Sequence, residues 1–219
     1  MCNCLTVRME KAAKRRKRDL PIRTYTAHLM TMDLFLRKVA PGAEFQIPYP
    51  NMWPKAFITK YRIPETVQTF LFSPFNVIHH PNYIFDNDKD KLRYVIPMAP
   101  AGITDNRFVN LRAHTTQVAR ISPQQFVREL TAVERKVDSI WAKPKKILVF
   151  YDYTLAPKAV QTRAKLFQKL ARNTVDWPLI SVKETVKRNR KDPNVWPHYS
   201  GKTYLGCLSQ IERLEQNAT

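Results

Sequence analysis

Cysteine, glycine and long apolar runs are scarce in this sequence, and each shortage excludes a class of protein. The 219 residues include three cysteines and four glycines. Cys2, Cys4 and Cys207 make no disulfide framework, and such sparse cysteine is typical of a reducing compartment. Four glycines leave no Gly-x-Gly-x-x-Gly loop for a dinucleotide. No apolar run approaches the roughly 20 residues of a membrane-spanning helix, so we expect no membrane insertion.

Positive charge, by contrast, is in large excess. The chain has 37 Lys and Arg residues against 18 Asp and Glu, which gives a net charge of +19. Residues 1–23 hold eight basic residues against two acidic ones, and residues 143–202 hold fourteen against four. The segment between these two regions carries only +4. Such a field attracts polyanions, chiefly nucleic acid and less often an anionic membrane.

The two basic regions supply the candidate RNA contacts. The compact run KAAKRRKRD (11–19) suits phosphate contact, although a targeting or solubility sequence has the same composition. A helix expected over residues 157–173 gathers its basic residues on one side, and the basic loop 187–191 extends that ridge. The expected inward face of this helix consists of Val160, Ala164, Phe167 and Leu170. The sixteen candidate RNA-binding residues are Lys11, Lys14, Arg15, Arg16, Lys17, Arg18, Arg23, Lys158, Arg163, Lys165, Lys169, Arg172, Lys187, Arg188, Arg190 and Lys191.

The first part of the chain predicts one helix, an extended segment and several short strands. The helix lies within residues 24–42, where Pro41 and Gly42 supply a stop. Residues 45–57 contain three prolines, which forbid a helix and disfavour a central strand, so this segment should be extended. The β-rich pieces are residues 56–63, 66–72, 92–98 and 107–114.

The clearest local signal is a helix over residues 122–141. Ser122 is placed to cap it, Pro123 suits its first turn and Gln125 completes a capping box. Its apolar stripe consists of Phe126, Leu130, Val133, Val137 and Trp141. The later elements are expected to be a strand around 146–153, the helix 157–173, a strand in 177–182, a strand-turn-strand in 195–208 and a terminal amphipathic helix in 208–216.

Two short motifs in the C-terminal region carry a family resemblance. QTRAKLFQKLARN (161–173) lies in the helix after the first strand, and PNVWPHYSGKT (193–203) is a proline-led strand that reaches a Tyr-x-Gly turn. With these motifs, residues 145–216 resemble the thioredoxin-like domain shared by accessory mitochondrial ribosomal proteins and an accessory subunit of respiratory complex I. Lys165 departs from that family, which tends to be acidic at this position.

The predicted fold class is therefore α+β, in three regions. Residues 1–23 form a basic N-terminal arm. Residues 24–142 hold a helix, the Pro-rich extended segment, short strands and the capped helix. The resemblance implies that residues 143–219 form a thioredoxin-like α/β domain.

Active-site motifs are incomplete in this sequence. Thioredoxin chemistry requires Cys-x-x-Cys at the helix N-terminus, where the helix dipole lowers a thiol pKa, and this chain has DYTLAP (152–157) there. Residues 201–203, Gly-Lys-Thr, resemble the end of a phosphate loop, but Trp196 replaces the required glycine. Neither the histidines at 79–80 nor the acidic run at 86–90 has the spacing of a zinc or calcium site. We therefore expect no catalytic residue, no metal and no cofactor.

Charge and resemblance together predict a non-enzymatic subunit of the mitochondrial ribosome. Its expected partners are ribosomal RNA and neighbouring ribosomal proteins, with no small-molecule substrate. The resemblance and the Arg-rich, acid-poor N-terminus favour the mitochondrial matrix, although KRRKR also fits a nuclear signal. Two alternatives stay open: an accessory subunit of a respiratory membrane complex, and an RNA-processing factor with His79, His80, Asp86 and Asp88 as its candidate groups.

Overall fold

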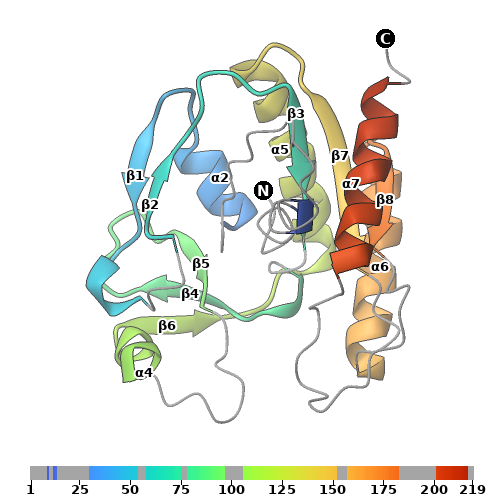
Figure 1. Ribbon diagram of the computed structural model, residues 1–219. Helices are drawn as coiled ribbons and strands as arrows, with labels where there is room; N and C mark the ends of the chain where they lie inside the picture. Colours follow the sequence, from blue (N-terminus) through green and yellow to red (C-terminus); the bar gives the residue numbers. More distant parts are fainter. Residues whose placement is uncertain are drawn as a thin grey trace. The chain divides into compact units, whose positions relative to one another are not determined.

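The chain divides by its contacts into two compact units (Figure 1). Unit 1 comprises Met1–Thr26, Thr69–Phe75 and Lys145–Thr219, and unit 2 comprises Ala27–Gln68 and Asn76–Pro144. Helices and strands are both present, so the α+β class is confirmed. None of the helices in the described stretches has the length and apolarity needed to cross a bilayer. The computed structural model describes residues 9, 12, 13, 30–53, 58–74, 78–96, 106–151, 157–182 and 201–216.

The predicted helix over residues 122–141 is confirmed as α5 (Pro123–Ile140) of unit 2. Ser122 Oγ accepts a hydrogen bond from the Gln125 amide at 3.1 Å, which satisfies one orphan donor of the first turn. The reciprocal bond of a capping box is absent from the described residues, where the Gln125 side chain donates to Glu129 Oε1 at 3.0 Å instead. The whole predicted stripe is buried: Phe126, Leu130, Val133, Val137 and Trp141.

A shorter helix, α2 (Met32–Lys38), lies inside the helix predicted within residues 24–42, whose first part is outside the described residues. Thr31 caps it, because its Oγ1 accepts a hydrogen bond from the Leu34 amide at 3.0 Å. The helix ends before Gly42, whose φ of 70° is a left-handed conformation that glycine adopts without strain.

Unit 2 also contains two antiparallel sheets. The first pairs β1 (Glu44–Gln46) with β2 (Lys60–Arg62). The second has the order β5-β4-β6. Its strands are β4 (Asn82–Phe85), β5 (Arg93–Val95) and β6 (Thr115–Val118). The predicted β-rich pieces 56–63 and 92–98 therefore do contain strands, β2 and β5.

The strand predicted over residues 107–114 is wrong. These residues form helix α4 (Asn106–Ala113), and the strand begins only at Thr115. Phe108 and Leu111 stand three residues apart, which is a helical spacing, and Leu111 is buried. The aromatic and β-branched content of these residues had suggested a strand.

The Pro-rich segment 45–57 is not extended throughout. It begins in β1, but the 3₁₀ turn η1 (Pro50–Met52) follows, with proline at a helical first-turn position that suits its fixed φ. Trp53 after the turn is buried, and its Nε1 donates to the Pro48 carbonyl at 2.8 Å. The described part of this segment therefore folds back on itself.

Unit 1 contains a three-stranded parallel sheet in the order β3-β7-β8. The predicted strands around 146–153 and in 177–182 are confirmed as β7 (Lys145–Tyr151) and β8 (Leu179–Val182). They are joined through the predicted helix, α6 (Lys158–Thr174). β3 (Thr69–Phe72) comes from the predicted middle region, so that region contributes to both units.

The last helix, α7 (Gly201–Gln216), corrects another prediction. A strand-turn-strand is predicted over residues 195–208, but the part from Gly201 onward is helical, and the earlier part lies outside the described residues. The buried residues of α7 recur at helical spacing: Tyr204, Cys207, Leu208 and Ile211. This helix contacts β8, beside which it is drawn in red in Figure 1.

Candidate nucleic-acid interface

Five of the sixteen predicted RNA contacts lie in the described residues, and α6 carries all five. They are Lys158, Arg163, Lys165, Lys169 and Arg172. The others lie outside the described residues, and their role stays a prediction: Lys11, Lys14, Arg15, Arg16, Lys17, Arg18, Arg23, Lys187, Arg188, Arg190 and Lys191. Within the described residues, the candidate interface therefore consists of α6.

The sequence of α6 forms a helix for local reasons. Most of its 17 residues are Ala, Leu, Lys, Arg or Gln, which have high helix propensity. Pro157 stands just before the first helical residue, where its missing N–H breaks no helical hydrogen bond. The helix ends at Thr174, because Val175 takes an extended conformation while its amide still donates to Ala171 at 3.1 Å.

The buried face of α6 is narrow and consists of Ala164, Phe167 and Ala171. The first two belong to the predicted inward face, which is confirmed for them, and Ala171 extends it by one turn. Val160 and Leu170, also predicted to face inward, are only half-buried. Much of the helix circumference is thus left to polar and charged side chains.

Four of the five cations on α6 are exposed to solvent: Lys158, Lys165, Lys169 and Arg172. Arg163 is half-buried, and its guanidinium carbon lies 4.6 Å from the ring centroid of Phe167 in a cation–π contact. The helix itself therefore partly holds Arg163, whereas the other four cations face solvent.

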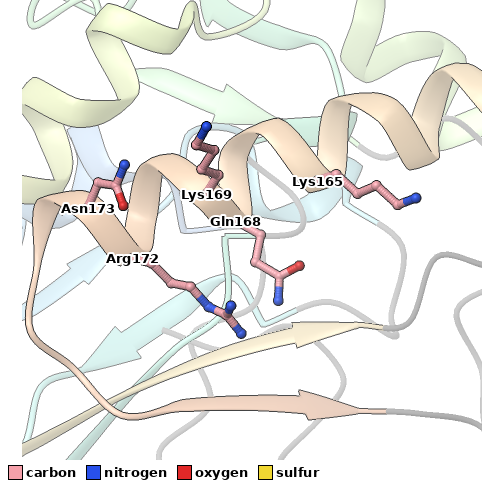
Figure 2. Close-up of a pocket in the computed structure, with 5 residues that line it drawn as sticks. All are labelled: Lys165, Gln168, Lys169, Arg172 and Asn173. Atoms are coloured by element: carbon pink, nitrogen blue, oxygen red, sulfur yellow. The ribbon is translucent and has the colours of Figure 1, made fainter.

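Two amides accompany the exposed cations. Gln168 and Asn173 line an open pocket of about 310 Å³ together with Lys165, Lys169 and Arg172 (Figure 2). In the close-up, Gln168 and Arg172 project to one side of the helix, while Lys169 and Asn173 project to the other. Sequence analysis missed the two amides. The available signal was their spacing from the lysines. Gln168 follows Lys165 by three residues and Asn173 follows Lys169 by four, and side chains so spaced are neighbours on a helix surface.

The exposed cations of α6 are not neutralised within the described residues. The helix contains no acidic residue, and none of the ion pairs in the described stretches involves Lys165, Lys169 or Arg172. The ion pairs in which both partners are described residues belong to unit 2. Their cations are Arg37, Lys38, Lys60, Arg62 and Arg93. Among the described residues, the α6 surface therefore presents a row of positive charges without an ion-pair partner.

Some exposed cations of unit 2, among them Lys38 and Lys60, already act on carboxylates, which the described residues show for none of the exposed α6 cations. A hydrogen bond from Lys60 lowers the pKa of Glu44, and a hydrogen bond from Lys38 lowers the pKa of Asp90. The nitrogen–oxygen distances are 2.8 Å for Lys60 and 2.5 Å for Lys38. These paired cations provide a natural comparison for the unpaired ones.

Three of the groups named for an RNA-processing activity, His80, Asp86 and Asp88, have surroundings that are typical of structural residues. Burial lowers the pKa of His80 to about 4, so the imidazole is neutral at pH 7. Asp88 accepts hydrogen bonds from two following backbone amides at 3.0 and 3.1 Å, as a turn-forming aspartate does. Asp86 accepts one from the Thr116 hydroxyl at 3.0 Å. Within the described part of the chain, no three His, Cys, Asp or Glu side chains are grouped so that they could hold a metal.

Comparison with known proteins adds no family assignment. A scan against protein-family models matched none, and searches of curated proteins and of solved structures found no match. The resemblance of residues 145–216 to a thioredoxin-like domain therefore stays a prediction.

Proposed function

We propose that this chain is a non-enzymatic structural subunit of the mitochondrial ribosome, located in the matrix, that binds ribosomal RNA and neighbouring ribosomal proteins. The observation that carries the proposal is the row of exposed cations on α6, which form no ion pair with any other described residue. Lys158 and Arg172 are fourteen residues apart, which corresponds to roughly 21 Å along a helix axis. A polyanion of regular spacing is the partner that such a row fits.

Physical reasons favour a nucleic acid over a small anion. Each phosphate neutralised by Lys or Arg releases condensed counterions, so affinity grows with the number of contacts in a row. The α6 backbone that carries the row is also held in place, because Phe167 and Ala171 anchor the opposite face in the protein interior. Helical anchoring reduces the conformational entropy that the interface loses on binding. The basic arm and the basic loop would add further contacts in this proposal.

The proposal includes a thioredoxin-like fold for residues 143–219. The parallel strand-helix-strand unit β7–α6–β8 supports it, whereas α7 replaces at least the second half of the expected strand-turn-strand. The sequence between β7 and α6, DYTLA (152–156), has no thiol. The scaffold therefore serves binding in this proposal and not disulfide exchange.

Salt-dependent RNA binding tests the role of α6. The full-length protein and its Lys165→Gln, Lys169→Gln, Arg172→Gln variant are titrated with mitochondrial ribosomal RNA at several salt concentrations. Because each phosphate contact contributes a log–log slope of about 0.7 to 0.9, the variant should lose roughly 2 units of slope.

The matched control removes the same number of charges from exposed ion pairs of unit 2: Lys38→Gln, Lys60→Gln and Arg62→Gln. This control should keep the slope of the unmodified protein. An equal loss in both variants would show that net charge, and not the α6 row, determines binding.

Fractionation tests the assembly. A tagged chain should sediment with mitochondrial ribosomal particles in high salt and should be released by nuclease. Retention in a respiratory membrane complex after nuclease treatment would support the accessory-subunit alternative and contradict the proposal. An RNA-cleaving activity that disappears in His80→Ala would support the RNA-processing alternative.

A further inference from the structure

We infer that the α6 face bearing Gln168 binds base-paired RNA across its minor groove, with Lys165 and Arg172 on phosphates and the Gln168 amide on a ribose 2′-hydroxyl. This inference rests on the proposed RNA binding and adds the class of RNA and the group that is recognised. Three observations on α6 carry it.

The first observation is that α6 offers no aromatic surface to a base. Proteins that bind unpaired RNA stack its bases on exposed aromatic side chains. Phe167 is the only aromatic residue of α6, and it is fully buried. The pocket residues are Lys, Gln, Arg and Asn, residue types that contact backbone groups and groove edges in nucleic-acid complexes. This composition suits a duplex, whose bases are stacked on one another.

The second observation is the straight, regular spacing of the cations. Lys165, Lys169 and Arg172 follow one another at intervals of four and three residues, so they lie on successive turns of the exposed part of α6, where Lys169 and Arg172 project to opposite sides (Figure 2). A rigid row of this kind matches the repeating phosphates of a duplex. RNA duplexes are recognised mainly by shape and by phosphate and 2′-hydroxyl contacts across the wide minor groove.

The third observation is the position of Gln168 between two cations. Its side chain projects to the same side as Arg172 and belongs to the same pocket as Lys165 (Figure 2). Among the described residues, no hydrogen bond involves the side-chain amide of Gln168, and this side chain is half-exposed. An amide both donates and accepts, whereas phosphate oxygens only accept. The 2′-hydroxyl also donates and accepts, and it distinguishes RNA from DNA.

The test uses the full-length protein and four probes at one fixed salt concentration. They are a blunt RNA duplex of about 20 base pairs, which exceeds the span of roughly 16 base pairs covered by a double-stranded-RNA module, a DNA duplex of the same sequence, one unpaired RNA strand, and vesicles containing phosphatidylserine. Fluorescence anisotropy measures affinity for the nucleic acids, and flotation measures vesicle binding. The RNA duplex should bind most tightly.

Gln168→Ala should reduce the preference for RNA over DNA duplex about fivefold, the usual effect of one hydrogen bond, and leave the salt slope unchanged. The matched control is Gln210→Ala, which removes an exposed glutamine from α7 and should leave the preference intact. An unchanged preference in Gln168→Ala, or tighter binding of the single strand, overturns the inference but leaves the proposed RNA binding standing. Absence of RNA binding, or stronger binding to vesicles than to any RNA, overturns the proposed function as well.

Discussion

The guanidinium of Arg93 on β5 donates a hydrogen bond to the carboxylate of Glu129 on α5, and both side chains are largely buried. Arg93 also lies 3.6 Å from the Asp33 carboxylate, and its backbone amide donates to the same carboxylate at 2.9 Å. One residue thus connects β5 to both helices, α2 and α5. Loss of a single partner leaves a buried charge without compensation, which costs much more than the pair itself contributes.

This relationship gives the first prediction. Arg93→Met should destabilise unit 2 by roughly 3 kcal/mol, because the Glu129 carboxylate loses its buried partner. Urea unfolding followed by tryptophan fluorescence measures the change. The double variant Arg93→Met, Glu129→Leu removes both charges and should recover part of the loss. The single variant Glu129→Leu completes the cycle. If the double variant loses as much stability as Arg93→Met and Glu129→Leu lose in total, then the two side chains are not energetically coupled.

The second prediction concerns the two residues predicted to cap α5. Ser122→Ala should lower stability by about 1 kcal/mol, because the Gln125 amide at the first turn loses its hydrogen-bond acceptor. Gln125→Ala should cost less, since its side chain bonds to Glu129 and does not cap the helix. Urea unfolding of the two variants gives the comparison. Equal losses would indicate that the full capping box forms in solution.

The third prediction is a pH dependence that arises from His80. Burial lowers its pKa from 6.5 to about 4, and Arg120 adds a smaller effect in the same direction. The unfolded chain therefore binds the proton more tightly than the folded one, so stability is complete above pH 6.5 and falls as the pH decreases toward 4. Between pH 6.5 and about 5 the protein should lose about 1.5 kcal/mol.

His80→Gln separates this effect from acid titration of carboxylates. The pKa values of Glu44 and Asp90 are lowered from 4.5 and 3.8, so these groups titrate below the window in which His80 acts. Urea unfolding of His80→Gln should be nearly independent of pH between 6.5 and about 5. A variant that keeps the pH dependence of the unmodified protein would assign it to another group.

Sequence patterns predicted the elements whose signals are local. For α5, a capping serine and five apolar residues at helical spacing agree with each other, and the helix forms over the expected residues. α6 and β7 likewise follow from periodicity and a continuous apolar run. In α4 and α7 the local signals conflict. Aromatic and β-branched residues interrupt the helical apolar spacing of α4, and glycines interrupt that of α7. A strand was predicted for α4 and a strand-turn-strand for the first half of α7, whereas the helix predicted in residues 208–216 is confirmed as the second half of α7.

Non-local arrangements left no signal of this kind. β3 pairs in parallel with β7 although they lie far apart in the chain, and no local pattern specifies the partner of a strand. The basic residues of the candidate site were found from charge alone. Gln168 and Asn173 were missed because uncharged amides on a helix face become informative only when the neighbours that surround them in space are known.

The fourth prediction contrasts two glycines. Gly206 lies inside α7, and a Cβ added there would meet no atom within 4 Å. Gly206→Ala should therefore raise stability by about 1 kcal/mol, because alanine has the higher helix propensity and restricts the unfolded chain. Gly42 has a φ of 70°, and an added Cβ would approach the Glu65 carboxylate. Gly42→Ala should lower stability, because an alanine is strained at positive φ. Thermal unfolding of the two variants measures the two changes in stability, which should have opposite signs. Destabilisation by Gly206→Ala would contradict the interior helical position of Gly206, and with it the replacement of the predicted strand-turn-strand by α7.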